Sequence, residues 1–318
     1  MLTLNKEPEF SSISCQRVVK LMGNRFEFTV IAFNEESGEI AIDAAIAEVR
    51  RIEELLSTYK ENSQVNEINR NAGIRYVKVD REVTDLILRS LKISAITQGS
   101  FDITYGSIDK SLWNFDMNMT ALPDKETALQ AVRLINHKNV LVDKENSAIM
   151  LKHEGMRIGF GGIGKGYAAD RAKQVLQSQG IRSGIVNAAG DLITWGTQIN
   201  GSPWTIGIAD PNKQSNIFSS LNISNTAIAT SGNYEKYATI NGKKYSHTID
   251  PKTGLPVSGI KSVTIICPSA ELADAMATPV MVMGVTAGLH LVNQIMMVSC
   301  IIIDDQNNIY TSKNINVK

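Results

Sequence analysis

GFGGIGKG, residues 159–166, separates two differently organised parts of the chain. The stretch holds five glycines in eight residues and leads into a predicted helix at 167–179, which ends at Gly180. Helical periodicity is frequent before the stretch, whereas after it predicted strands follow one another in runs. Because strands and helices do not alternate strictly, the pattern indicates an α+β fold and not a doubly wound one.

Apolar periodicity and turn residues predict the other elements. On the N-terminal side we expect two short strands or one bent strand around Met22-Gly23, helices at 39–59 and 80–98, a helix opened by Pro123, and three short strands within 139–160. On the C-terminal side we expect helices at 270–283 and 286–296 and strands at 183–188, 191–194, 204–209, 226–230, 236–249, 297–303 and 308–312. With no internal repeat or linker, residues 1–16 are expected to form an N-terminal extension and residues 17–318 a single domain.

The composition argues against some classes of partner and site. Lys and Arg number 32 and Asp and Glu also 32, so the formal net charge is zero. This balance, without a basic cluster, argues against nucleic acid as a partner. Three widely spaced cysteines, Cys15, Cys267 and Cys300, indicate neither a disulfide framework nor a zinc cluster. Cys267 and Cys300 lie in apolar runs and are expected to be buried.

The sequence contains no uninterrupted apolar run of membrane-spanning length, so we expect no membrane-spanning segment. Glu7, Pro8 and Glu9 stand where a signal peptide needs an apolar segment. As written, the sequence therefore indicates a cytoplasmic protein. A chain trimmed of its signal would read the same way and would be periplasmic or membrane-anchored.

The glycine-rich stretch itself could bind phosphate. Glycines let the backbone approach a ligand closely, a helix start offers free N–H groups, and Lys165 adds a positive charge. The spacing is neither that of a Walker A loop nor that of a dinucleotide-binding fingerprint. Tight packing between strand and helix explains the same glycines equally well.

A second motif runs from His247 to Gly254, HTIDPKTG. Pro251 to Gly254 are typical of a turn, which would hold His247 and Asp250 near each other at the end of a strand. A histidine there could accept a proton from a hydroxyl nucleophile. The alternative is a histidine that only packs at the end of a sheet.

A third motif, ADAMAT at 273–278, places Asp274 and Thr278 one helical turn apart. A carboxylate with a hydroxyl or carbonyl suits Mg²⁺, and small neighbours let another segment approach. In isolation the structural alternative is stronger, because Asp274 could cap or pair and Thr278 could bond to its own helix.

Two further segments are less specific. GSFDIT at 99–104, followed by Leu112-Trp113, could form a wall against a planar ring, although such aromatics more often belong to the core. TSGNY at 230–234 is a polar break in an apolar strand, and it could face a ligand or be a simple turn.

Taken together and in this order, these segments resemble the ApbE family of FAD:protein FMN transferases. The resemblance runs from about Met22 to Gly284 and rests on Met22-Gly23, Ser57-Thr58-Tyr59, Gly99–Thr104, Leu112-Trp113, Gly161–Asp170, Asn187–Asp191, Thr230-Ser231-Gly232, His247–Gly254 and Ala273–Thr278. It implies a compact fold of two intimate lobes with FAD in the cleft between them.

The resemblance also implies roles for individual positions. FAD-contacting positions match Met22, Tyr59, Ser100, Phe101, Asp102, Gly159, Lys165 and Ile249. Metal positions match Asp274 and Thr278 and the carbonyls of Gly162 and Ala277. His247 is the expected base, and with Asp274 it completes the expected catalytic pair.

The implied reaction is Mg²⁺-dependent transfer of FMN from FAD to a threonine of an acceptor flavoprotein, with release of AMP. The acceptors resemble subunits of membrane-bound electron-transport complexes. Two alternatives stay open on the same residues: a Mg²⁺-dependent FAD pyrophosphatase that gives FMN and AMP, and a non-catalytic FAD-binding protein.

Three positions depart from the commoner family pattern. Gly159 stands where many relatives have an acidic residue, Asn24 where threonine is usual, and Ala189 where glycine is usual. The departure at Gly159 concerns one adenosine or ribose contact. None of the three removes a proposed metal ligand or His247.

Overall fold

A computed structural model describes residues 12–109, 121–210, 213–233, 237–240, 243–246 and 248–315. Its core is an eight-stranded sheet of order β1-β2-β6-β7-β10-β13-β14-β15, in which every neighbouring pair is antiparallel. The strands span β1 Ile13–Leu21, β2 Asn24–Ala32, β6 Ser183–Ala188, β7 Asp191–Trp195, β10 Ala227–Gly232, β13 Ile260–Cys267, β14 Ser299–Asp304 and β15 Ile309–Thr311. With the helices described below, this arrangement confirms the α+β prediction.

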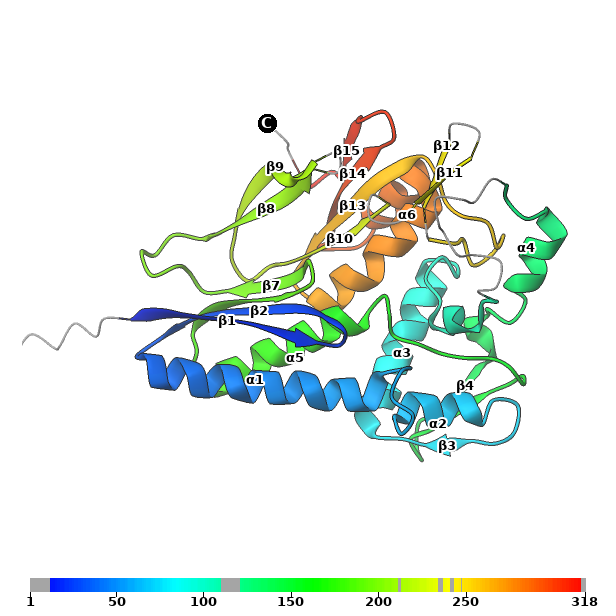
Figure 1. Ribbon diagram of the computed structural model, residues 1–318, viewed down its shortest axis with the longest axis horizontal. Helices are drawn as coiled ribbons and strands as arrows, with labels where there is room; N and C mark the ends of the chain where they lie inside the picture. The colour runs from blue at the N-terminus through cyan, green and yellow to red at the C-terminus, as the bar shows by residue number, and fades with distance from the viewer. Residues whose placement is uncertain are drawn as a thin grey trace, which may run out of the picture.

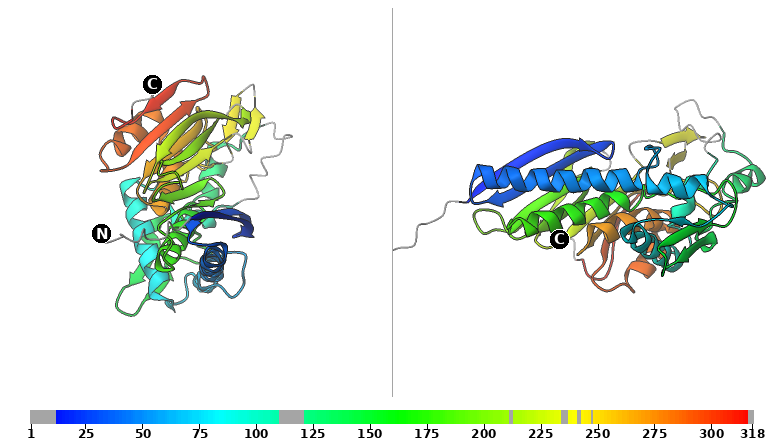
Figure 2. Two further views of the ribbon diagram at one scale, coloured as in Figure 1. Left: turned by 90° about the vertical axis from the view of Figure 1, so that its left-hand side faces the viewer. Right: turned by 90° about the horizontal axis from the view of Figure 1, so that it is seen from below.

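Three helices pack against this sheet: α1 (Glu35–Leu56), α5 (Gly164–Ser178) and α6 (Ala270–Val292). The helices α1 and α5 run side by side beneath β1 and β2, and α6 lies against β10 and β13 (Figure 1, Figure 2). The Asn34 side chain caps α1 by accepting a hydrogen bond from the backbone N–H of Ser37. The Ser37 hydroxyl in turn accepts one from the backbone N–H of Asn34. The buried face of α1 carries Ile42, Val49 and Ile52, all fully buried, as its apolar periodicity predicts.

A smaller group of elements lies at one end of the sheet, on the right in Figure 1. It contains α2 (Gln64–Arg70), α3 (Arg81–Ile96), α4 (Lys125–Ala131), the short 3₁₀ helices η1 (Ile103–Ser107) and η3 (His137–Asn139), and a three-stranded sheet of order β3-β5-β4. Those strands are β3 Val77–Lys78, β4 Val140–Asp143 and β5 Ala148–Leu151. Two separate ribbons pair β8 (Trp204–Asp210) with β9 (Lys213–Ile223) and β11 (Tyr237–Ile240) with β12 (Lys243–Ser246).

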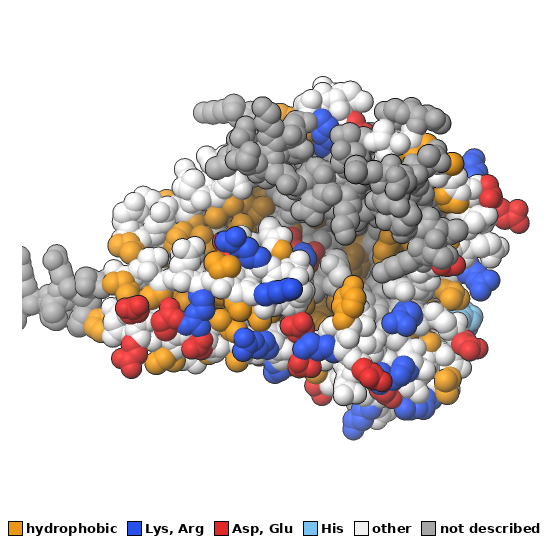
Figure 3. Space-filling model, viewed as in Figure 1, with side chains coloured by type: hydrophobic (Ala, Val, Ile, Leu, Met, Phe, Trp, Pro, Cys, Tyr) orange, Lys and Arg blue, Asp and Glu red, His pale blue; other side chains and the backbone are white. Residues whose placement is uncertain are grey.

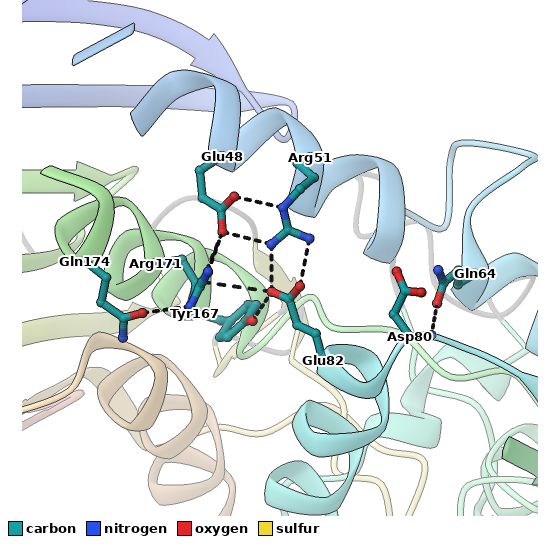
Figure 4. Close-up of polar contacts among 8 residues, drawn as sticks. All are labelled: Glu48, Arg51, Gln64, Asp80, Glu82, Tyr167, Arg171 and Gln174. Atoms are coloured by element: carbon teal, nitrogen blue, oxygen red, sulfur yellow. Dashed lines mark hydrogen bonds and ion pairs between the residues drawn. The ribbon is translucent and has the colours of Figure 1, made fainter. Parts of the chain in front are cut away.

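A charged network fastens α1, α3 and α5 to one another (Figure 4). Arg51 of α1 donates to Glu48 of its own helix at 2.8 Å and to both carboxylate oxygens of Glu82 on α3, at 2.7 and 2.9 Å. Arg171 of α5 donates to Glu48 at 2.9 Å, and the Tyr167 hydroxyl donates to Glu82. The network lies where the ends of the three helices meet and holds the start of α5 in place.

Helix α6 is the one described helix that is long and apolar enough, by length and composition, to cross a membrane. In this fold it is a core helix: Ala273, Asp274 and Met276 are buried against the sheet and α5. Its backbone departs from helical geometry at Gly284, with φ 82°. This break confirms the predicted division into two helices near residues 284–285.

Several expectations about elements are corrected. Only two strands, not three, lie within 139–160, and the expected strand 236–249 is the hairpin β11–β12 followed by a turn. Helix α5 begins at Gly164, so Lys165 and Gly166 belong to its first turn. The short helix α2 and the strand β9 were not expected. Asp80 occupies the N-cap of α3, but its side chain accepts no capping hydrogen bond.

The strand pair around Met22-Gly23 is a hairpin, whose two turn residues both have positive φ angles, 49° and 74°. Such angles are required by the tight turns that match the twist of paired strands. All three cysteines are buried free thiols, which confirms the prediction for Cys267 and Cys300.

Candidate active site

The start of α5 touches the first turn of α6, and this contact defines the centre of the candidate site. The backbone N–H of Gly166 donates to Asp274 Oδ2 at 3.0 Å. A Cβ added to Gly166 would lie 2.1 Å from the carbonyl oxygen of Ala270 and 2.8 Å from Asp274 Cβ. No side chain fits there, so the close approach requires glycine at this position.

Asp170 holds the same two helices together one turn further along α5. Its carboxylate accepts from the backbone N–H groups of Ala270 and Glu271, both at 3.0 Å, and from the Ser269 hydroxyl at 2.8 Å. A carboxylate at a helix N-terminus satisfies free N–H groups and complements the positive end of the helix dipole. Asp170 thereby fixes where α6 begins and where Asp274 lies.

Two carboxylates and one ammonium meet beside this contact. Lys165 Nζ pairs with Asp191 Oδ2 on β7 and lies 4.0 Å from Asp274 Oδ1. Both aspartates are buried, at 4% and 6% exposed. Burial, and then the charge of Asp191, raises the pKa of Asp274 to about 7, while Lys165 and the N–H of Gly166 act in the opposite direction.

The Thr278 hydroxyl lies one helical turn after Asp274 and 3.5 Å from the Ser231 hydroxyl of β10. Ser231 therefore brings the polar stretch 230–234 to the same region as the ADAMAT motif. Thr230 pairs with Thr264 across the β10–β13 ladder at 2.9 Å between hydroxyls. The expected polar break is thus, up to Gly232, part of a regular strand.

Other segments separated in sequence gather around the glycine-rich stretch. A Cβ placed on Gly162 would lie 3.7 Å from Phe101 Cε2, one on Gly164 would lie 3.7 Å from Met22 Cε, and one on Gly159 would lie 3.5 Å from Thr58 Cγ2. The hairpin turn at Met22 is held by Glu53 of α1, whose carboxylate accepts the Met22 N–H at 3.1 Å.

In the segment 99–104, Phe101 is 7% exposed and its ring packs in the core against the glycine-rich stretch. Of the two alternatives for this aromatic, the core position is the one that the structure confirms. Ser100 is also buried. The carboxylate of Asp102 accepts from the backbone N–H and hydroxyl of Thr104, at 2.8 and 2.6 Å, and from the N–H of His137 at 2.8 Å. The Asp102 side chain is therefore occupied by contacts within the protein.

The Asp250–Gly254 turn lies next to this segment, as Ile249 N–H donates to the Tyr105 hydroxyl at 3.3 Å. Gly254 N–H closes the turn on the Asp250 carbonyl at 2.9 Å. A cavity of about 440 Å³ opens between the two segments, lined by Gly99, Asp102, Pro251 and Lys252 among others. His247, Leu112, Trp113 and Tyr234 lie outside the described residues, and the Tyr59 side chain is 95% exposed.

A larger cavity of about 600 Å³ is lined by residues of α3, α5 and the start of α6. Several of its charged groups already have partners in the fold: Arg89 pairs with Glu271 at 2.6 Å, and Asp170 caps α6. Charges of both signs also intermingle over the face seen in Figure 3, which carries α1. The smaller cavity and the Asp274 cluster are therefore the better candidates for chemistry.

The residues around Asp274 fit a hard cation. Within the described ranges, no three His, Cys, Asp or Glu side chains group to hold a metal, so hydroxyl or carbonyl oxygens would have to complete the coordination. Thr278 and the carbonyls of Gly162 and Ala277 are donors of that kind. With both carboxylates deprotonated, one ammonium beside them also leaves a net negative charge, which attracts a divalent cation.

Comparison with known proteins identifies the family of this sequence. The sequence profile described as the ApbE family matches residues 22–302. The chain belongs to the ApbE family. A FAD:protein FMN transferase of Klebsiella pneumoniae is 32% identical over 271 residues, which cover 83% of this chain and 77% of the relative. A FAD:protein FMN transferase of Escherichia coli K12 is 32% identical over 238 residues, 73% of this chain and 68% of the relative.

Solved structures of ApbE proteins share the fold. The ApbE protein of Thermotoga maritima superposes with a TM-score of 0.83 at 31% identity, covering 95% of this chain and 97% of that one. The flavin transferase ApbE of Vibrio cholerae gives a TM-score of 0.81 at 24% identity, with 95% and 98% coverage. The α+β class expected from the sequence is thus that of the ApbE structures.

Sequence reasoning gave no individual role to Asp191, Asp170 or Ser231. Asp191 and Asp170 lie within or at the end of matched motifs, but their partners come from other elements far along the chain. Only the folded structure brings Asp191 to Lys165 and Ser231 to Thr278.

Proposed function

We propose that this ApbE-family protein transfers FMN from FAD to a threonine hydroxyl of an acceptor flavoprotein, with Mg²⁺, and releases AMP. The observation that carries the proposal is the buried Asp274 at the contact between the glycine-rich turn and α6. The named relatives, which are FAD:protein FMN transferases, support the same reaction.

The cation would be held by Asp274 and Thr278 and by the carbonyls of Gly162 and Ala277. When bound, Mg²⁺ supplies positive charge to the pyrophosphate oxygens as the P–O bond breaks. Lys165, whose side chain is 26% exposed beside Asp274, adds a second positive charge for the phosphates. The small residues around Asp274 leave room for the glycine-rich turn to approach.

The proposed step exchanges one P–O bond for another. The threonine oxygen attacks the phosphorus on the FMN side, the bond to the AMP phosphate oxygen breaks, and AMP leaves with the electron pair of that bond. The threonine proton goes to a base, for which His247 is our candidate from the sequence. His247 follows β12 and precedes Ile249, whose N–H bonds to Tyr105.

The remaining proposed FAD contacts come from several segments. Met22 and Phe101 lie on segments that meet the glycine-rich stretch, Gly159 is the first residue of that stretch, and the N–H of Ile249 donates to the Tyr105 hydroxyl. We propose that exposed Tyr59 covers the ligand, and that Ser100 and Asp102 act through the shape of their segment, because both are buried. The acceptor is expected to be a subunit of a membrane electron-transport complex.

Hydrolysis of FAD to FMN and AMP is a second candidate, because water could replace threonine at the same metal and phosphate contacts. A protein that binds FAD without turnover is a third candidate. A buried carboxylate at the proposed metal site favours turnover, since binding alone needs no cation at the pyrophosphate.

The deciding experiment incubates the protein with FAD, Mg²⁺ and a threonine-bearing acceptor domain, then weighs the acceptor and assays AMP. An acceptor heavier by one FMN, with matching Mg²⁺-dependent AMP, is the expected result. Free FMN with two different unmodified acceptors would indicate hydrolysis. Absence of AMP would leave only the binding protein.

A further inference from the structure

The ion pair between Lys165 and Asp191 joins a helix to a strand of the central sheet. Lys165 lies in the first turn of α5, and Asp191 is the first residue of β7. The sheet fixes the position of the Asp191 backbone, because Asp191 pairs with Ala188 across the β6–β7 turn. The same turn is fixed by hydrogen bonds from Gly190 N–H to Asn187 Oδ1 at 2.8 Å and from Ala189 N–H to Arg25 O at 3.0 Å.

The ammonium is shared unequally between its two acidic neighbours. Lys165 Nζ is in direct contact with Asp191 and is 4.0 Å from Asp274 Oδ1. A partly buried ammonium that lost the closer acid would move towards the remaining one, because an unpaired charge in a partly buried site is unfavourable. It would then occupy the side of Asp274 that a cation needs.

The net charge of the site also predicts that loss of Asp191 weakens cation binding. When both acids are deprotonated, Lys165, Asp191 and Asp274 together carry one net negative charge, which attracts a divalent cation. Lys165 and Asp274 alone would be neutral, and the attraction would be lost. With all three groups and a divalent cation, the site carries one net positive charge, which suits the pyrophosphate of FAD.

We propose that Asp191 is a positioning residue that holds the Lys165 ammonium on the β7 side of the site, so that Asp274 stays available to a divalent cation. The inference rests on the proposed function, because it assumes that a cation binds at Asp274. It gives Asp191 no contact with the cation or with FAD.

The test is a cation titration of the full-length protein. Mn²⁺ binding is followed by electron paramagnetic resonance, with and without FAD, for wild type, Asp191→Asn, Lys165→Met and the double variant. Asp191→Asn is expected to weaken Mn²⁺ binding about tenfold or more. Lys165→Met is expected to bind Mn²⁺ more tightly than wild type. The double variant is expected to bind Mn²⁺ about as tightly as wild type, because the competing ammonium is gone.

A parallel titration follows FAD binding by flavin fluorescence in the presence of Mg²⁺. Lys165→Met is expected to weaken FAD binding although it binds Mn²⁺ more tightly, a split that loss of structure would not produce. Lys173→Met, eight residues along the same helix, is the matched control and is expected to change neither titration. Thermal melts show whether each variant is folded.

Three results would overturn the inference. Unchanged Mn²⁺ affinity in Asp191→Asn would show that Asp191 does not protect the cation position. A double variant as weak as Asp191→Asn would make Asp191 a ligand or a structural residue, and a Lys165→Met variant that binds Mn²⁺ no tighter would remove the competition. If wild type itself bound no Mn²⁺ with or without FAD, the proposed cation site would fail as well, and this pattern differs from the other three.

Discussion

The backbone N–H of Gly166 lies 3.0 Å from Asp274 Oδ2, and this hydrogen bond joins the beginnings of α5 and α6 through two residues that are 108 positions apart in the chain. The contact is possible only because residue 166 has no side chain. The position of the proposed metal ligand therefore depends on a glycine in another motif.

Gly166→Ala should separate α5 from α6. Its Cβ would collide with the backbone of Ala270, which has no freedom to rotate away. We expect a loss of about 3 kcal/mol in the free energy of unfolding, at the upper end for an overpacked core, and loss of metal-dependent activity. The matched control is Gly161→Ala, where nothing lies within 4 Å of the added Cβ. Equal denaturant midpoints for the two variants would contradict the prediction.

Asp274→Asn should abolish metal-dependent activity and alter the pH dependence of stability. The pKa of Asp274 is raised to about 7 in the folded protein, against about 3.9 in an unfolded chain. The folded state therefore holds this proton more tightly, and metal-free wild type loses stability as the pH rises from about 4 to about 7. The variant lacks this loss.

The measurement compares melting temperatures of both proteins at pH 5 and pH 8 without metal, then at pH 8 with Mg²⁺. The melting temperature of Asp274→Asn, relative to that of wild type, should rise by a few degrees between pH 5 and pH 8. Mg²⁺ should raise only the melting temperature of wild type. Parallel pH profiles would show that the Asp274 carboxylate is not destabilised in the fold.

Ala189→Gly should stabilise the protein. Ala189 has φ 56°, in the left-handed region, and is exposed. A residue with a Cβ costs about 1–2 kcal/mol in this conformation, and glycine loses about 0.5–1 kcal/mol in chain entropy. We expect a net gain of about 0.5–1 kcal/mol by urea denaturation. A loss of stability would mean that the Ala189 methyl makes contacts that outweigh the strain.

Gly159→Asp should introduce the acidic residue that the family resemblance implies at this position, without harm to the fold. The added Cβ would meet only Thr58 Cγ2, at 3.5 Å, which is an ordinary contact. We expect a melting temperature close to wild type and tighter FAD binding, measured by flavin fluorescence. Tighter binding of FAD but not of FMN would locate the new contact on the adenosine side; weaker FAD binding would oppose the assignment of this position.

Glu82→Gln should weaken the junction of α1, α3 and α5. The hydrogen bond from Arg51, with help from Tyr167, lowers the pKa of Glu82 although burial acts against it. The stabilisation is present above the unfolded pKa of about 4.3 and is lost as the pH falls through the lower folded pKa. Because these groups are partly exposed, we expect a deficit of about 1 kcal/mol at pH 7.

This deficit should shrink towards pH 3, where wild type also loses the charge. Glu54→Gln is the control, since Glu54 pairs with Lys60 at a more exposed position and joins no two helices. A similar deficit for both variants at pH 7 would show that the junction adds nothing beyond a surface ion pair.

Local pattern was sufficient where local interactions decide structure. The apolar spacing of α1, the glycine stop at Gly180 and the i, i+4 placement of Asp274 and Thr278 all follow from neighbours along the chain, whereas the predicted start of α1 at residue 39 missed its cap at Asn34. Short elements were less predictable. The seven-residue helix α2 and the split of 236–249 into a hairpin depend on packing and turns that periodicity does not record.

The sequence by itself determined the fold class, the order of the motifs and the family to which the chain belongs. Only the tertiary structure decided that Phe101 is buried against Gly162 and that the Asp102 carboxylate accepts hydrogen bonds from Thr104 and His137. It also decided that Asp191 pairs with Lys165 beside Asp274. The reason is physical: burial and ion pairing act through space between residues that are far apart in the chain, and the sequence pattern records only what each residue shares with its neighbours.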